Sequence, residues 1–126
     1  MEGVVAQPTV RWLPRRTNLR LLLRRPTTLL RAYWPVILLL LLGATADVWT
    51  TYQNLAAYGV EVEVHWPQRV VSQLVGIEAG VPLAKVIQLA FVIAVACWWR
   101  PWCGPLLGIC GGLYALAAFN NHFLWL

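Results

Sequence analysis

Three long stretches of the chain are apolar and carry few charged residues, and they define its organisation. A helix needs about 20 residues to cross the roughly 30 Å hydrocarbon core of a bilayer. The stretches at 33–58, 81–99 and 105–126 have about that length or more. The pattern therefore predicts an all-α membrane protein, with a basic N-terminal arm at residues 1–31 and a three-helix transmembrane domain at residues 32–126.

The first apolar stretch has a second interpretation. A basic start, the apolar run Val36–Leu42 and the small residues Ala44, Thr45 and Ala46 also resemble a cleavable signal peptide. A 46-residue leader would be long, and the residues after it remain compatible with a helix for three more turns. We expect a membrane span here, with the signal peptide as the alternative.

The segment between the first two spans changes its periodicity. Residues Val60–His65 alternate between apolar and polar side chains, which is typical of an extended chain. Pro67 then suits the first turn of a helix, and four apolar residues follow at helical spacing before Gly76. These are Val70, Val71, Leu74 and Val75. We expect a short helix that lies at the membrane interface.

Composition predicts that the chain lies in a membrane, and the distribution of charge predicts its orientation there. Hydrophobic residues make up 60% of the chain and charged residues 12%, which excludes an ordinary soluble domain. The net charge is +5, and seven of the ten basic residues precede the first span. Because cytoplasmic segments are enriched in Lys and Arg, we expect a multi-pass protein of the cell membrane, with the N-terminus in the cytoplasm and the C-terminus outside.

The arginines of the arm are expected to bind the membrane surface, where they lie beside anionic headgroups. Nucleic acid is the competing partner for such an arm, and direct attachment to a membrane helix argues against it. The residues expected to bind the bilayer surface are Arg15, Arg16, Arg20, Arg24 and Arg25.

Polar residues inside the spans are costly in lipid unless they face protein or a wet cavity. They occur at similar depth in all three helices, so we expect one buried polar cluster with an ion pair between Asp47 and Lys85. The expected members are Asp47, Thr50, Thr51, Asn54, Lys85, Gln88 and Asn120. The four in the first helix follow the i, i+3, i+4, i+7 pattern and share one face.

The loop offers a candidate metal site. An extended chain would project Glu61, Glu63 and His65 from one side, and carboxylates with an imidazole are ligands for a divalent metal. Asp47 or His122 would be further ligands. The alternative is a solvated strand edge that binds nothing.

The third span carries small residues at regular spacing. Gly104, Gly108 and Gly112 recur every four residues, which lets another helix backbone approach closely. We expect a packing face for another helix of this chain, for a second copy in a homo-oligomer, or for another membrane protein.

Several of these features together resemble a family of small bacterial multi-pass membrane proteins whose own function is unassigned. The resemblance covers Asp47 to Gln88 and rests on 47–51, on Gly59–Pro67, and on Gly80 with Lys85. It implies a bacterial inner-membrane protein and treats four residues as one set, namely Asp47, Glu63, His65 and Lys85. Here Trp66 separates His65 from Pro67, which departs from the family pattern and puts the role of His65 in doubt.

No stretch of the chain matches a catalytic signature, so we do not expect an enzyme. The favoured hypothesis is a scaffold or accessory subunit whose polar cluster fixes helix packing, because three short helices are expected to enclose little volume. The alternative is a site-bearing protein with an outer-leaflet pocket, formed by Asp, Glu, His and Lys side chains, for a metal ion, a proton or a lipid headgroup.

Overall fold

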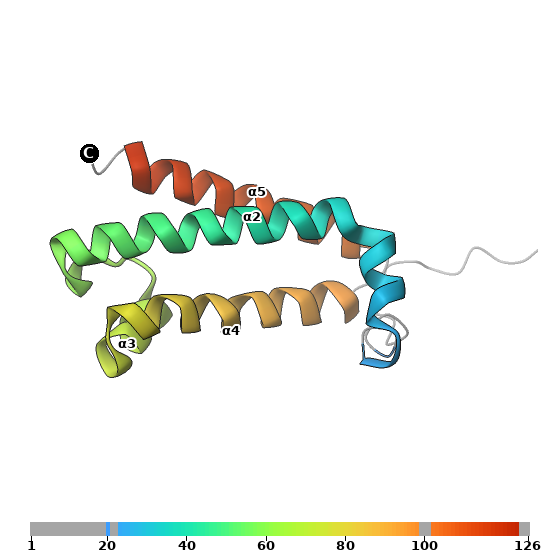
Figure 1. Ribbon diagram of the computed structural model, residues 1–126, viewed down its shortest axis with the longest axis horizontal. Coiled ribbons are helices and arrows are strands. Elements are labelled where there is room, and N and C mark those ends of the chain that lie inside the picture. The colour runs from blue at the N-terminus through green and yellow to red at the C-terminus, as the bar shows by residue number, and fades with distance from the viewer. Residues whose placement is uncertain (1–19, 21–22, 99–101, 124–126) are drawn as a thin grey trace, which may run out of the picture.

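The computed structural model describes residues 20, 23–98 and 102–123. Its elements are α2 (Pro26–Tyr58), the 3₁₀ turn η1 (Val60–Val62), α3 (Trp66–Val75), α4 (Ile77–Trp98) and α5 (Cys103–Phe123). The three long helices run roughly alongside one another and alternate in direction, and α3 folds back at the start of α4 (Figure 1). We call the end that carries η1 and α3 the loop end.

Helices α2, α4 and α5 are each long and apolar enough to cross a membrane. Their outward faces carry large apolar side chains that no other described residue covers, such as Leu42 on α2, Phe91 on α4 and Leu116 on α5. Exposure of such an apolar surface to water is unfavourable, whereas its exposure to lipid is not. The arrangement is that of a multi-pass membrane protein, as the hydropathy pattern predicts.

The first helix begins earlier than expected and bends where the expected span starts. Helix α2 begins at Pro26, and Tyr33 departs from helical geometry with φ −123° and ψ 16°. Pro35 lies two residues further on, and a proline clashes with the carbonyl four residues before it, which bends a helix. The turns before Tyr33 therefore leave the axis of the bundle (Figure 1).

The arm lies mostly outside the described residues, including Arg15 and Arg16. Arg20, Arg24 and Arg25 are described and are exposed. The starts of the other two spans differ from the expected ones by a few residues. Helix α4 begins at Ile77 rather than at 81, and α5 begins at Cys103 rather than at 105.

Among the three long helices, α2 and α5 make the most extensive contact. A Cβ atom placed on Gly43 would lie 2.6 Å from the Gly111 carbonyl oxygen, and one on Gly111 would lie 2.9 Å from the Leu40 backbone nitrogen. Only glycine allows two backbones to approach this closely. Further along, Leu40 forms an apolar core with Ala96 of α4 and with Cys103 and Leu107 of α5.

This contact differs from the expected packing face at Gly104, Gly108 and Gly112. The first two have only ordinary contacts with α2, at 3.5 Å to Tyr33 and 3.6 Å to Val36, and Gly112 has nothing within 4 Å. The glycine that meets α2 at close range is Gly111, one position away from the regular series. Within the described part of the chain, Gly104 and Gly108 thus pack against α2 at ordinary distance, and the close backbone contact is made by Gly111.

The loop after α2 is not the extended segment that its alternation predicts. Residues Val60–Val62 form η1, and the extended backbone angles of Glu63 and His65 follow it. An extended strand needs a neighbouring strand for its backbone groups, and the described residues offer none. Arg69 supplies the alternative, since its guanidinium donates to the carbonyl oxygens of Glu61 at 2.8 Å and Glu63 at 2.9 Å.

Helix α3 is present as expected, with its polarity inverted relative to a soluble helix. Gln68 and Ser72 are buried, whereas Trp66 is 72% exposed and Leu74 is 78% exposed. Ser72 packs against α4, where a Cβ on Gly80 would lie 2.5 Å from the Ser72 Cα. An exposed apolar face at the end of three membrane-length helices is stable in the interfacial region of a bilayer.

The glycine contact gives a stability prediction. Gly43→Ala forces a methyl group into the Gly111 carbonyl, and we expect a loss of ~1–3 kcal/mol of unfolding free energy from overpacking. Gly112→Ala is the control, because its Cβ enters open space and alanine favours a helix. Unfolding in detergent, followed by circular dichroism, measures both. Equal stability of the two variants would contradict the α2–α5 contact.

Candidate functional site

The expected ion pair forms at the loop end, between α2 and α4. Lys85 Nζ lies 2.5 Å from Asp47 Oδ2, and the two side chains are only 6% and 10% exposed. Lys85 also donates to Gln88 Oε1 at 3.0 Å and lies 4.3 Å from the ring centroid of Tyr114 on α5. A lysine in this setting has its charge balanced by a carboxylate and its remaining protons directed at an amide and an aromatic face.

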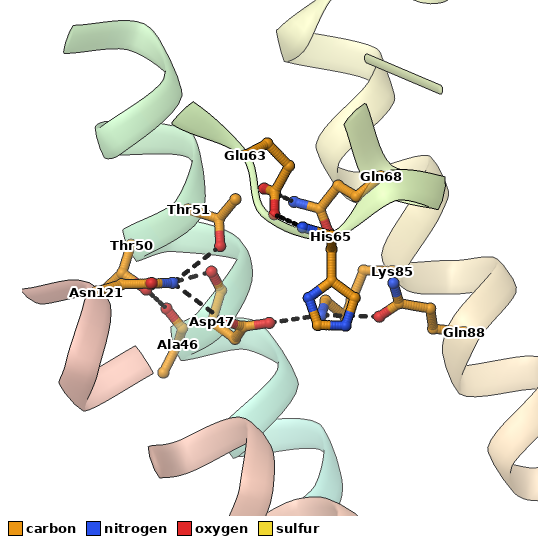
Figure 2. Close-up of polar contacts among 10 residues, drawn as sticks. All are labelled: Ala46, Asp47, Thr50, Thr51, Glu63, His65, Gln68, Lys85, Gln88 and Asn121. Atoms are coloured by element: carbon orange, nitrogen blue, oxygen red, sulfur yellow. Dashed lines mark hydrogen bonds and ion pairs between the residues drawn. The ribbon is translucent and has the colours of Figure 1, made fainter. Parts of the chain in front are cut away.

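Asn121 connects the same carboxylate to α5. Its side-chain amide donates to Asp47 Oδ1 at 3.3 Å and to Thr51 Oγ1 at 3.1 Å (Figure 2). Its backbone carbonyl accepts a hydrogen bond from Asn54 Nδ2 at 3.2 Å. Asp47 is therefore bonded to both other long helices, and all three are joined through one side chain.

The remaining expected members of the polar cluster divide in two. Thr51, Asn54 and Gln88 take part in contacts between or beside the helices, as described above. Thr50 is buried, but its hydroxyl donates to the carbonyl oxygens of Ala46 and Asp47 on its own helix. Asn120 is exposed and joins no hydrogen bond of the cluster, and its neighbour Asn121 occupies the position expected for it.

The helical phase explains this difference. The α5 residues that are buried or that contact another helix recur at alternating steps of four and three, and they are Leu107, Gly111, Tyr114, Ala118 and Asn121. Asn120 is one position out of phase. Once the structure places Gly111 against α2, the helical repeat puts Asn121 on the same side of α5, whereas the sequence alone left the two adjacent asparagines equivalent.

Glu63 is held at the start of α3. One of its carboxylate oxygens accepts a hydrogen bond from the His65 backbone N–H at 2.9 Å, and the other accepts one from Gln68 Nε2 at 3.0 Å. A carboxylate at this position also faces the positive end of the helix dipole. Figure 2 shows the Glu63–Gln68 segment above the Asp47–Lys85 pair, with the His65 imidazole extending from the loop toward it.

The candidate metal set does not assemble. Among the described residues, no three His, Cys, Asp or Glu side chains gather as metal ligands. The 3₁₀ turn leaves Glu61 exposed, and the Glu63 carboxylate binds its own loop instead of converging with His65. His122 is also exposed, in the last turn of α5, and contacts Phe123.

A cavity of about 650 Å³ lies beside the ion pair. Its polar lining residues are Asp47, Thr51, Asn54, Glu63, His65, Gln68, Lys85, Gln88, Asn120 and Asn121. Its other lining residues are largely apolar, namely Leu55, Val62, Val64, Cys110, Leu113, Tyr114 and Ala117. This loop-end cavity is large enough for a small molecule, and the expectation that three helices enclose little volume is wrong.

The cavity exists because only one of two adjacent faces of α5 is covered by another helix. One face packs on α2, and the neighbouring face, formed by Cys110, Leu113, Ala117 and Asn120, lines the cavity. Helix α4 contacts α2 and α5 far less than these two contact each other, and α3 holds its start. The three helices share an apolar core away from the loop end, whereas near the loop end α4 reaches α2 through the Lys85 side chain.

The ion pair gives a double-mutant prediction. Asp47→Asn leaves a buried ammonium without its counter-ion, and Lys85→Gln leaves a buried carboxylate, so each should cost ~3–5 kcal/mol of unfolding free energy. In the double variant both charges are gone, and we expect a loss well below the sum. Denaturant titration of all four proteins in micelles measures the coupling. Additive losses would show that the two groups do not interact.

A second prediction separates the adjacent asparagines. Asn121→Ala removes the bonds to Asp47 and Thr51, and we expect a loss of ~1–3 kcal/mol because Asp47 Oδ1 then lacks its donor. Asn120→Ala is the matched control and should change stability by less than ~0.5 kcal/mol, as exposed positions do. The same titration is the measurement, and the reverse order would be inconsistent with this register of α5.

Comparison of the chain with known protein families, characterised proteins and solved structures finds no match, so the interpretation of the site rests on its geometry.

Proposed function

We propose that this protein binds the polar headgroup of a membrane amphiphile in the loop-end cavity. The observation that carries the proposal is a cavity of about 650 Å³ that is lined by both polar and apolar side chains. Ligand sites in proteins are usually apolar hollows with a few oriented polar groups. The loop-end cavity has that composition at the end of a membrane-length bundle.

The two kinds of wall match the two parts of an amphiphile. Glu63, His65 and Gln88 supply hydrogen-bonding groups from the loop and from α4. Leu113 and Ala117 supply an apolar wall on α5, and Leu113 is also exposed on the outside of the bundle. A chain-bearing molecule could therefore leave its headgroup in the cavity and its apolar tail along α5.

A scaffold role is the second candidate, and a separate observation favours it. Asp47, Lys85 and Asn121 link α2, α4 and α5 through a polar network that is nearly satisfied within the protein. In lipid such a network favours one arrangement of the helices. It needs no ligand, and it also provides a rigid, neutral base for the cavity.

Membrane orientation follows from the arginine-rich arm. With the arm in the cytoplasm, the loop end faces the outside and the cavity opens in the outer leaflet. We extend the proposal accordingly to an outer-leaflet amphiphile of a bacterial inner membrane.

Filling the cavity tests the proposal. Ala117→Phe places an aromatic ring against the cavity, whereas Leu116→Phe, one residue away, adds a ring to a lipid-facing position. We expect Ala117→Phe to reduce amphiphile bound per protein after detergent purification by at least about tenfold, through loss of contact and volume. Mass spectrometry of the bound fraction is the measurement.

The control variant should retain the wild-type amount. If Ala117→Phe folds normally and retains the same amphiphile as Leu116→Phe, the binding proposal fails and the scaffold interpretation remains.

A further inference from the structure

The charges that line the loop-end cavity do not balance. Asp47 and Lys85 neutralise each other at 2.5 Å. Glu63 is the remaining formal charge on the wall, and its carboxylate accepts hydrogen bonds from neutral donors, the His65 backbone and the Gln68 amide. No Lys or Arg side chain among the described residues forms an ion pair with it.

The nearest arginine is already occupied. Arg69 directs its guanidinium to the backbone carbonyl oxygens of Glu61 and Glu63, and it does not line the cavity. The cavity wall therefore carries one formal negative charge when His65 is neutral. A partly desolvated carboxylate without a counter-ion favours a cationic partner.

Two other side chains of the wall supply acceptors that an ammonium can use. A neutral imidazole has one acceptor nitrogen, and an asparagine side chain has a carbonyl oxygen. His65 and Asn120 both line the cavity, and neither side chain has a hydrogen-bond partner within the described part of the protein. With Glu63 they offer three acceptors, the number of protons on a primary ammonium.

A metal ion fits this wall less well than an organic cation. Divalent ions require several carboxylate, carbonyl or imidazole ligands that converge on one point. The described acidic and imidazole groups do not gather in threes, and the apolar wall of Leu113 and Ala117 has no use in a metal site.

We infer that the loop-end cavity selects amphiphiles that carry an ammonium group, with the Glu63 carboxylate as the recognition element. The inference rests on the proposed headgroup-binding function and adds the chemical class of the ligand. The ammonium lies at the loop, against Glu63, and the tail lies along α5. The shared chemistry can come from an aminophospholipid headgroup or from a single-chain alkylammonium.

Binding of four single-chain amphiphiles of equal tail length to the purified full-length protein tests the inference. They are a lysophosphatidylethanolamine, an alkylammonium, a lysophosphatidylglycerol and a neutral monoacylglycerol. We expect wild-type protein to bind at least one ammonium-bearing ligand about tenfold or more tightly than the neutral one, as a charge-assisted contact provides. The phosphatidylglycerol analogue should bind no better than the neutral one.

Two variants in the same loop assign the effect to one carboxylate. Glu63→Gln should remove the preference while neutral binding persists, and Glu61→Gln should keep the preference, because Glu61 is exposed and lies outside the cavity. The wild-type comparison stands by itself if Glu63→Gln does not fold.

The outcomes separate the two proposals. Equal affinity for all four ligands, or a preference that survives in Glu63→Gln, overturns the ammonium inference and leaves headgroup binding intact. Absence of saturable binding by any ligand overturns the proposed function itself. A preference for the phosphatidylethanolamine analogue alone identifies a lipid source, and a preference for the alkylammonium alone identifies a lipophilic cation.

Discussion

A carboxylate within an apolar helix is the constraint on which the rest of this structure depends. Asp47 cannot face lipid at acceptable cost, so its helix must place it against donors from other segments. Lys85 of α4 and Asn121 of α5 supply them, and Thr51 supports the asparagine from Asp47's own helix. One side chain thereby fixes the rotation of α2 and the partners that its polar face must meet.

The remaining contacts of the bundle are unequal, and the inequality creates the cavity. Glycines bring α2 and α5 into backbone contact, whereas the ion pair reaches α4 through a long lysine side chain that allows greater separation. The helices meet again at the apolar core around Leu40 and Ala96. Close packing on one side and a side-chain bridge on the other leave volume at the loop end, where the polar groups already lie.

The loop between α2 and α3 is also held by polar groups that find their partners within the protein. Arg69 satisfies carbonyl groups that an isolated segment leaves open, and Glu63 occupies the start of α3. Both residues join the loop to a helix that buries Gln68 and Ser72 and exposes Trp66 and Leu74. The polar loop segment is thus held beside the neutral Asp47–Lys85 ion pair, and the Glu63 carboxylate remains available to a ligand in the cavity.

The sequence by itself determined the three membrane-length helices, the short interfacial helix and the need for Asp47 to find Lys85, because hydropathy and the cost of charge in lipid act on each segment locally. It did not determine that Gly111, rather than Gly104, Gly108 or Gly112, makes the close backbone contact with α2, that Asn121 rather than Asn120 reaches Asp47, or that the alternating loop forms a 3₁₀ turn. Those outcomes depend on helix rotation and on hydrogen-bond donors from the next helix, such as Arg69. Only the tertiary structure decided these contacts. It also decided the cavity, because the volume of a cavity depends on distances between helices, and no local sequence pattern contains those distances.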